Sequence, residues 1–166
     1  VDRFMMKVLV GYPTEAEEFV IVQRVTGMPA TAAAVADTAQ LMALQAQCRQ
    51  GYVDPALVQY AVKLVAATRD PVRCGLPELA PYLTFGASPR ATISLIEGAR
   101  ALAFLRGRPY ALPQDLIDLV PDVLRHRVVL SYEGLSEGLT SDALIDRIMK
   151  QVPPPARPLA PEQRAA

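Results

Sequence analysis

Apolar residues recur at three- and four-residue intervals along most of this chain, which is the spacing of one face of an α-helix. Capping residues, prolines and glycines bound these stretches. The pattern therefore predicts helices over residues 14–27, 37–51, 54–70, 88–107 and 113–121, and a last helix that begins at Thr140 or Ser141. Together these elements predict a mostly α-helical, bundle-like fold.

One stretch near the N-terminus departs from the helical pattern. Residues 4–10 form a short apolar run of strand-forming residues, which Gly11 and Pro13 end. A single strand needs neighbours in a sheet, and the rest of the chain does not supply several. We therefore expect this strand to belong to a sheet outside the sequence.

Three further segments also lack the helical pattern. Residues 70–88 contain three prolines and two glycines and predict a long connection, of the kind that is usually functional or mobile. Residues 131–138 predict a polar turn. Residues 153–166 contain five prolines, so we expect this tail to be extended or disordered.

The overall charge argues against two classes of function. The chain has 17 basic and 17 acidic residues and a net charge of zero, which argues against broad electrostatic binding of nucleic acid or of an acidic membrane. No apolar run approaches the roughly 18 residues that span a bilayer, and the first residues do not form a signal peptide. Cys48 and Cys74 have no metal-ligand spacing and are expected to be reduced thiols of a cytoplasmic protein.

The sequence has no motif with which it could hold a nucleotide by itself. It lacks a glycine-rich phosphate-binding loop and a strand that ends in paired acids for magnesium. Its one histidine, His126, has no partners for a metal or catalytic site and is expected to be structural or solvated. Arg106 and Arg108 are expected to be solvated cations at the C-terminal end of a helix.

One predicted helix begins with an arginine that local stability does not explain. Ser88 is a good N-cap and Pro89 suits the first helical position. Arg90 follows in the first turn, where a cation opposes the helix dipole. It is either an ordinary solvated arginine or one that reaches for an anion. Arg3, just before the predicted strand, is a second arginine whose structural role would be at most a surface salt bridge.

Five short motifs occur in a characteristic order over residues 1–130. They are Asp2-Arg3-Phe4, Gly11-Tyr12-Pro13, Gly86-Ala87-Ser88-Pro89-Arg90-Ala91, Gly98-Ala99-Arg100-Ala101 and Val123-Leu124-Arg125-His126-Arg127. This ordered set resembles the C-terminal portion of the MoxR-family AAA+ ATPases, which are related to the magnesium chelatase ATPase subunits.

The resemblance implies the helical lid domain of an AAA+ ATPase, with one short N-terminal strand left from the α/β core. Residues 1–12 would be the remnant of that core, residues 13–150 the lid and residues 151–166 a Pro-rich flexible tail. Arg90 matches the sensor-2 arginine, with Ser88 and Pro89 in the same nucleotide-binding motif. Arg3 matches the arginine finger, which acts in trans on the nucleotide of a neighbouring subunit. A guanidinium suits both roles because it stays charged and offers a fork of donors to phosphate oxygens.

The resemblance also implies what lies outside this sequence. The Walker A, Walker B and sensor-1 residues are expected upstream of Val1, so ATP and Mg²⁺ would be held mainly by that core. We expect no cofactor and no metal on this chain alone, and no ATP hydrolysis by it. Further implications are a homo-oligomeric ring, a chaperone-like role and von Willebrand factor A domain partners. We expect no membrane or nucleic-acid partner.

Two other functions compete with an ATPase lid. The chain could be a stand-alone helical interaction domain, which would bind a protein through apolar grooves and through its tail as a polyproline ligand. It could also bind nucleic acid through the arginines at 100–108. The neutral charge and the lack of interleaved aromatic residues count against the nucleic-acid function.

Overall fold

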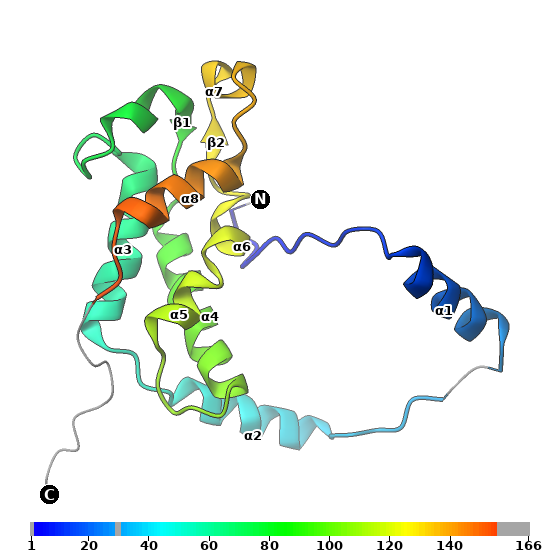
Figure 1. The fold of residues 1–166 in the computed structure, drawn as a ribbon. Coiled ribbons are helices and arrows are strands. Elements are labelled where there is room, and N and C mark those ends of the chain that lie inside the picture. The colour runs from blue at the N-terminus through cyan, green and yellow to red at the C-terminus, as the bar shows by residue number, and fades with distance from the viewer. Residues whose placement is uncertain (1, 29–30, 156–166) are drawn as a thin grey trace, which may run out of the picture.

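The computed structural model describes residues 2–28 and 31–155 (Figure 1). It is mostly helical, which confirms the predicted fold class. The elements in order are α1 (Glu15–Thr26), α2 (Thr38–Arg49), α3 (Pro55–Arg69), the 3₁₀ helix η1 (Pro77–Tyr82), β1 (Leu83–Phe85), α4 (Pro89–Leu105), α5 (Pro113–Ile117), α6 (Val120–Leu124), β2 (Val129–Leu130), α7 (Tyr132–Ser136) and α8 (Ser141–Gln151).

Capping residues begin α1, α2, α3, α4 and α8 where the sequence predicts. Thr14 and Glu17 form a reciprocal capping box at α1, because each side chain bonds to the other residue's backbone N–H. Asp54 caps α3, and Pro55 occupies its first turn, where a missing N–H is tolerated. Thr140 caps α8. These local rules explain why the helix starts are predictable from sequence.

The core lies where α3, α4 and α8 meet the short helices α5 and α6. In Figure 1, α8 runs across the body from near α6 to α3 and packs against both, while α2 lies against the far end of α4. The largest side chains that are fully buried include Leu57, Leu64, Leu79, Leu95, Leu116, Leu124, Leu144, Ile145 and Ile148. Burial of side chains of this size contributes about 1.5–3 kcal/mol each relative to an exposed position.

The connection between α3 and α4 is more ordered than the sequence predicts. It contains η1 and β1, and β1 pairs antiparallel with β2 so that Leu83 faces Leu130 and Phe85 faces Val129. The polar turn predicted for residues 131–138 is also partly helical, since it contains α7. Strands of two or three residues are too short to produce a recognisable alternation, so the sequence pattern missed them.

The predicted strand over residues 4–10 is not formed in this structure. These residues have no regular secondary structure, and Val8, Leu9 and Val10 are exposed. A strand satisfies its backbone groups by pairing with a neighbour, and within the described ranges residues 4–10 do not pair with the two-stranded sheet of β1 and β2. The same stretch leads into α1, which buries none of its residues and stands apart from the helical body in Figure 1.

The predicted tail is only partly described. Residues 153–155 have no regular secondary structure, and residues 156–166 lie outside the described residues. Among the helices of the described ranges, none combines the length and the apolar character needed to cross a membrane.

Candidate functional site

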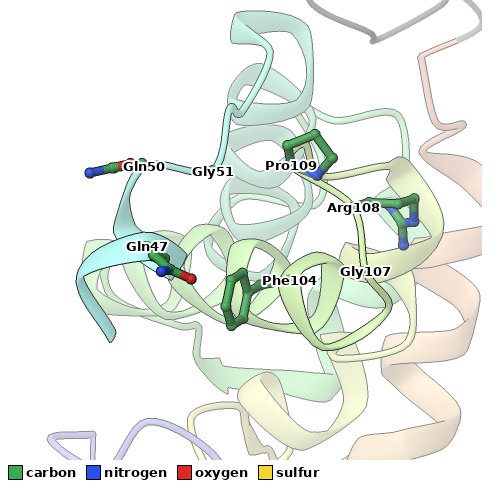
Figure 2. A pocket seen from close by; sticks show the side chains of 7 residues that line it. All are labelled: Gln47, Gln50, Gly51, Phe104, Gly107, Arg108 and Pro109. Atoms are coloured by element: carbon green, nitrogen blue, oxygen red, sulfur yellow. The ribbon is translucent and has the colours of Figure 1, made fainter. Parts of the chain in front are cut away.

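A hollow of about 450 Å³ opens at the C-terminal end of α4. Figure 2 shows side chains from α2, from the turn at Gly51 and from the loop after α4 around it. Its one charged lining residue, Arg108, is already bound to Asp115. The hollow lies at the opposite end of a 17-residue helix from Ser88 and Arg90, a length of about 25 Å. It therefore belongs to a different part of the surface from the predicted site.

Asp115 is a fully buried carboxylate beside this hollow. Arg108 donates two hydrogen bonds to it, at 2.8 and 2.6 Å, and Arg106 donates one at 2.7 Å. Burial alone would raise the pKa of Asp115, but the bonds from Arg108, the Leu112 amide and Arg106 outweigh it and lower that pKa. Arg106 and Arg108 are thus structural partners of a buried acid, which corrects their predicted role as solvated cations.

Replacing Asp115 by asparagine is expected to lower the free energy of unfolding at pH 7 by about 2 kcal/mol, because two guanidinium groups lose their shared buried anion. Both arginines are partly exposed, so water can solvate their guanidinium groups in the variant and limits the loss of stability. The pKa of Asp115 is lower when folded, so its contribution is present above the ordinary aspartate pKa and is lost as the pH falls through the folded value.

Urea denaturation at pH 7 and at acid pH measures both effects. The matched control is Asp70→Asn, which removes an exposed ion pair with Arg73 and should change the stability by less than about 1 kcal/mol. Equal stability of the two variants at pH 7 would contradict the structural role of Asp115.

The N-terminal end of α4 holds the predicted site in a fixed place. A Cβ atom on Gly86 would lie 2.2 Å from the carbonyl oxygen of Thr68, so only glycine allows this close approach. The Thr68 hydroxyl accepts a hydrogen bond from the Ala87 amide at 2.9 Å. Ser88 then accepts a bond from the Arg90 amide at 3.2 Å, and Pro89 fills the first helical position. The cap predicted at Ser88 is confirmed.

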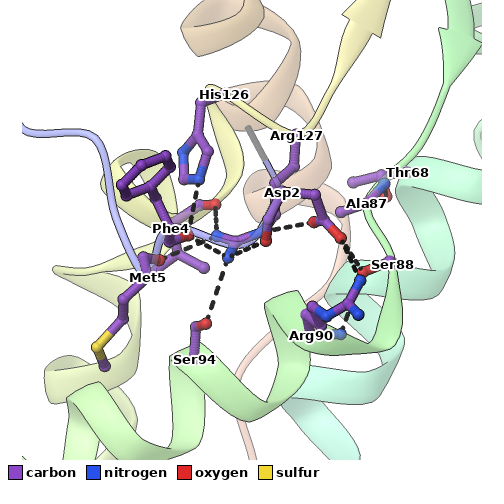
Figure 3. Close-up of polar contacts among 11 residues, drawn as sticks. Asp2, Phe4, Met5, Thr68, Ala87, Ser88, Arg90, Ser94, His126 and Arg127 are labelled. Atoms are coloured by element: carbon purple, nitrogen blue, oxygen red, sulfur yellow. Dashed lines mark hydrogen bonds and ion pairs between the residues drawn. The ribbon is translucent and has the colours of Figure 1, made fainter.

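Asp2 joins this helix start to the loop after α6 (Figure 3). One carboxylate oxygen, Oδ2, accepts a hydrogen bond from the Ser88 hydroxyl at 2.8 Å and from Arg90 Nη1 at 3.3 Å. The other, Oδ1, accepts one from Arg127 Nε at 2.9 Å. The Ser88 bond contributes most to lowering the pKa of Asp2; burial opposes it, and the bonds from Arg127 and Arg90 lower that pKa further. Asp2 is therefore an anion at neutral pH.

Arg127 binds the backbone on both sides of Arg3. Its side chain is only 1% exposed. It donates to the carbonyl oxygens of Asp2, Phe4 and Met5 at 3.2, 2.6 and 3.0 Å. It also donates to the hydroxyl of Ser94 on α4 at 3.4 Å. Residues 2–5 are consequently tied to the helical body by one buried guanidinium.

The two residues before Arg127 extend this attachment. His126 Nε2 lies 3.1 Å from the carbonyl oxygen of Phe4, which it can reach as a donor. Arg125 donates to the carbonyl oxygen of Lys7 at 2.8 Å, and the Lys7 amide donates to the carbonyl oxygen of Asp122. The run Arg125–Arg127 therefore fixes residues 2–7. The sequence motif contains this run, and a structural or solvated role was expected for His126, but the attachment of residues 2–7 was not predicted from it.

The two predicted phosphate-binding arginines remain accessible. The Arg90 side chain is 64% exposed, with Asp2 as its ion-pair partner. Arg3 is exposed and makes no hydrogen bond or ion pair with residues 2–28 or 31–155. The structure thus brings Ser88, Pro89 and Arg90 together with Asp2. Arg3 directly follows Asp2 in the sequence, so its backbone is held at the same place.

The charges of this cluster suit an anionic ligand. Asp2 supplies one negative charge between Arg90 and Arg127, so one positive charge is left over, and Arg3 adds another. An exposed guanidinium at a helix N-terminus can bind a phosphate, and the positive end of the helix dipole favours an anion there. No group of three or more His, Cys, Asp or Glu side chains that could hold a metal occurs in the described ranges.

Comparison with known proteins adds an independent finding. The family model of the AAA lid domain matches residues 78–148. The chain is 41% identical over 162 residues to chaperone MoxR1 of Mycobacterium tuberculosis, covering 98% of this chain and 43% of that protein. It is 35% identical over 169 residues to protein MoxR of Paracoccus denitrificans, covering 93% and 50%. The chain therefore spans about half the length of these relatives.

A solved structure gives the same picture of the fold. The crystal structure of a candidate ATPase from Cytophaga hutchinsonii superimposes with a TM-score of 0.88 at 33% identity. The match covers 92% of this chain and 47% of that one. The likeness extends beyond residues 78–148, because nearly the whole chain is included.

Proposed function

Because this chain belongs to the MoxR family of AAA+ ATPases and contains the lid domain, we propose that it supplies the lid side of an ATP site. Arg90 acts as the sensor-2 arginine and binds the γ-phosphate of a nucleotide held by an α/β core. Ser88 and Pro89 fix the helix start that presents Arg90. ATP and Mg²⁺ would be held mainly by the core.

The observation that carries this proposal is the state of Arg90. Arg106, Arg108, Arg125 and Arg127 are all committed to acids or carbonyl oxygens. Arg90 instead lies at a helix N-terminus with a mostly exposed guanidinium. Its position opposes the helix dipole, so local stability does not account for it. A phosphate bound there would gain from both the guanidinium and the helix end.

Arg3 acts as the arginine finger in the same proposal. A finger must project from a firmly held backbone, because misplacement of a catalytic group by about 1 Å can cost roughly a hundredfold in rate. Arg127 holds the residues on both sides of Arg3, while the Arg3 side chain itself is exposed. Arg3 is thus rigidly mounted and free to reach the nucleotide of a neighbouring subunit in a ring.

The exposed N-terminal stretch fits the same assembly. Residues 4–10 and α1 expose apolar side chains, including Val10, Phe19 and Val25 at 90, 64 and 78%. Such a surface marks a contact site. We propose that it packs against the α/β core and that residues 4–10 pair with the core sheet. A chaperone-like role, von Willebrand factor A domain partners and a cytoplasmic location are further parts of this proposal.

The test is the nucleotide affinity of an Arg90→Ala variant of the ATPase that contains this lid and its core. Loss of a charge-assisted bond to phosphate is expected to weaken ATP binding by about ten- to a hundredfold. ADP lacks the γ-phosphate, so its affinity should change much less. Equilibrium titration with fluorescent ATP and ADP analogues measures both.

Arg73→Ala is the matched control, since Arg73 is exposed and its ion pair is with Asp70, at the end of α3 rather than the start of α4. Its nucleotide affinities should equal those of the parent protein. If Arg90→Ala bound ATP as tightly as the parent, Arg90 would not be a phosphate sensor.

A further inference from the structure

Asp2 is shared between two parts of the site that have separate roles in the proposed function. Its Oδ2 accepts from Ser88 and Arg90 at the start of α4, and its Oδ1 accepts from Arg127 in the loop after α6. The next residue in the chain is Arg3. A single carboxylate therefore connects the proposed phosphate sensor to the backbone that bears the proposed finger (Figure 3).

The carboxylate also resembles the ligand proposed for Arg90. A carboxylate and a phosphate each present oxygens to the same fork of guanidinium donors. In this structure Asp2 Oδ2 lies 3.3 Å from Arg90 Nη1 and 2.8 Å from the Ser88 hydroxyl. A phosphate oxygen that engaged Arg90 would compete with Asp2 for this donor. The side chains of this pair are partly exposed, at 64% for Arg90 and 36% for Asp2. Replacement of Asp2 by a phosphate oxygen at Arg90 therefore does not leave a buried charge without a partner.

The other side of Asp2 would not be released by this exchange. The buried side chain of Arg127 donates hydrogen bonds to both the carboxylate and the carbonyl oxygen of Asp2. Loss of Arg90 leaves Oδ2 with the Ser88 hydroxyl and Oδ1 with Arg127, so the pull of Arg127 on the carboxylate is no longer opposed by a second guanidinium. A shift of Asp2 moves the backbone of Arg3, because the two residues are adjacent.

Resting on the proposed function, we propose that Asp2 is a positioning residue that couples Arg90 to Arg3. Its carboxylate holds Arg90 when no phosphate is present. When a phosphate binds Arg90 in its place, the Asp2 carboxylate pairs with Arg127 alone of the two guanidinium groups, and this sets the position of Arg3. The state of one nucleotide site is thereby passed to the finger that serves the next.

The test is an Asp2→Asn variant of the ATPase that contains this lid and its core. Asparagine keeps the size of the side chain but removes its charge, so it competes less well for Arg90. ATP affinity should rise by about two- to fivefold, the range expected for release of an exposed ion pair. The maximal turnover rate should fall by roughly ten- to a hundredfold, because the ion pair between Asp2 Oδ1 and Arg127, which sets the position of Arg3 in this proposal, is lost.

The opposite directions of these two changes distinguish positioning from a structural role. A variant that was merely misfolded would lose both affinity and turnover. Asp2→Glu keeps the charge and should recover ATP affinity to within about twofold of the parent, with part of the turnover restored. Asp70→Asn, which loses an exposed aspartate elsewhere, should leave both quantities unchanged.

The double variant Asp2→Asn, Arg90→Ala separates this inference from the proposed function. If Asp2 competes for Arg90, the gain in affinity disappears in the double variant. If Arg90→Ala weakens ATP binding but Asp2→Asn neither strengthens binding nor slows turnover, the coupling is wrong and the phosphate sensor stands. If Arg90→Ala leaves ATP binding unchanged, the proposed function fails, and this inference fails with it.

Discussion

Replacing Arg3 by alanine in the assembled ATPase is expected to lower the rate of ATP turnover by about 10³–10⁵-fold, the range found for arginine fingers. The Arg3 side chain is exposed and has no partner among residues 2–28 and 31–155, so its removal should leave the stability of the lid unchanged. ATP affinity should also change little, because the finger acts on another subunit's nucleotide. Steady-state turnover and nucleotide titration measure the two effects.

Arg73→Ala serves again as the control, because it too removes an exposed arginine from the lid surface. It should leave the turnover unchanged. Turnover of Arg3→Ala within tenfold of the parent would remove Arg3 from the catalytic machinery, and the exposed guanidinium would need another explanation.

Replacing Arg127 by methionine is expected to lower the free energy of unfolding of the 166-residue chain by about 3 kcal/mol. Methionine fills a similar volume but leaves the carbonyl oxygens of Asp2, Phe4 and Met5 without their donor. Asp2 also loses its buried partner. Residues 2–7 should then detach, and their amide hydrogens should exchange faster. Urea denaturation and hydrogen exchange test the two parts.

Arg147→Met is the matched control for this variant. Arg147 is an exposed residue of α8, so the same substitution there removes no buried donor. Arg127→Lys is expected to rescue little, because one ammonium cannot reproduce the spread of a planar guanidinium over several acceptors. Full stability of Arg127→Met, with slow exchange of the Lys7 amide, would contradict the attachment of residues 2–7 described above.

The helices of this chain are predictable because their boundaries are set by nearby residues. Thr14 with Glu17 and Asp37 with Gln40 each form a capping box within four residues, so the signal is local. The pairing of β1 with β2 joins segments that are more than 40 residues apart. Neither strand is long enough to show a pattern, and only the tertiary structure brings them together.

The candidate site shows the same division between local and distant signals. Arg90 is detectable from the sequence because a cation in the first turn of a helix opposes the dipole. Asp2 and Arg127 are 125 positions apart, and the residues around each of them give no indication that the two form an ion pair. One signal was available for Arg127, since it lies between the buried residues Val123 and Val128. Arg127 follows two polar residues, Arg125 and His126, so this signal is weak: a charged residue is rarely buried without a partner, but the sequence alone does not show that Arg127 is buried.

The central claim is that Arg90 serves the nucleotide of its own subunit and Arg3 that of a neighbour. The most direct test mixes two variants of the ATPase, Arg3→Ala and Arg90→Ala, each measured alone and after co-assembly. In a mixed ring, an Arg3→Ala subunit keeps its Arg90 sensor. If its neighbour is an Arg90→Ala subunit, that neighbour supplies an intact Arg3 finger to the same nucleotide, so the site is complete. About a quarter of the interfaces in randomly mixed rings should be of this kind. At an ATP concentration near the dissociation constant of the parent, where the weakened Arg90→Ala sites stay mostly empty, we therefore expect activity well above that of either variant alone. Turnover no greater than the average of the two would contradict the claim.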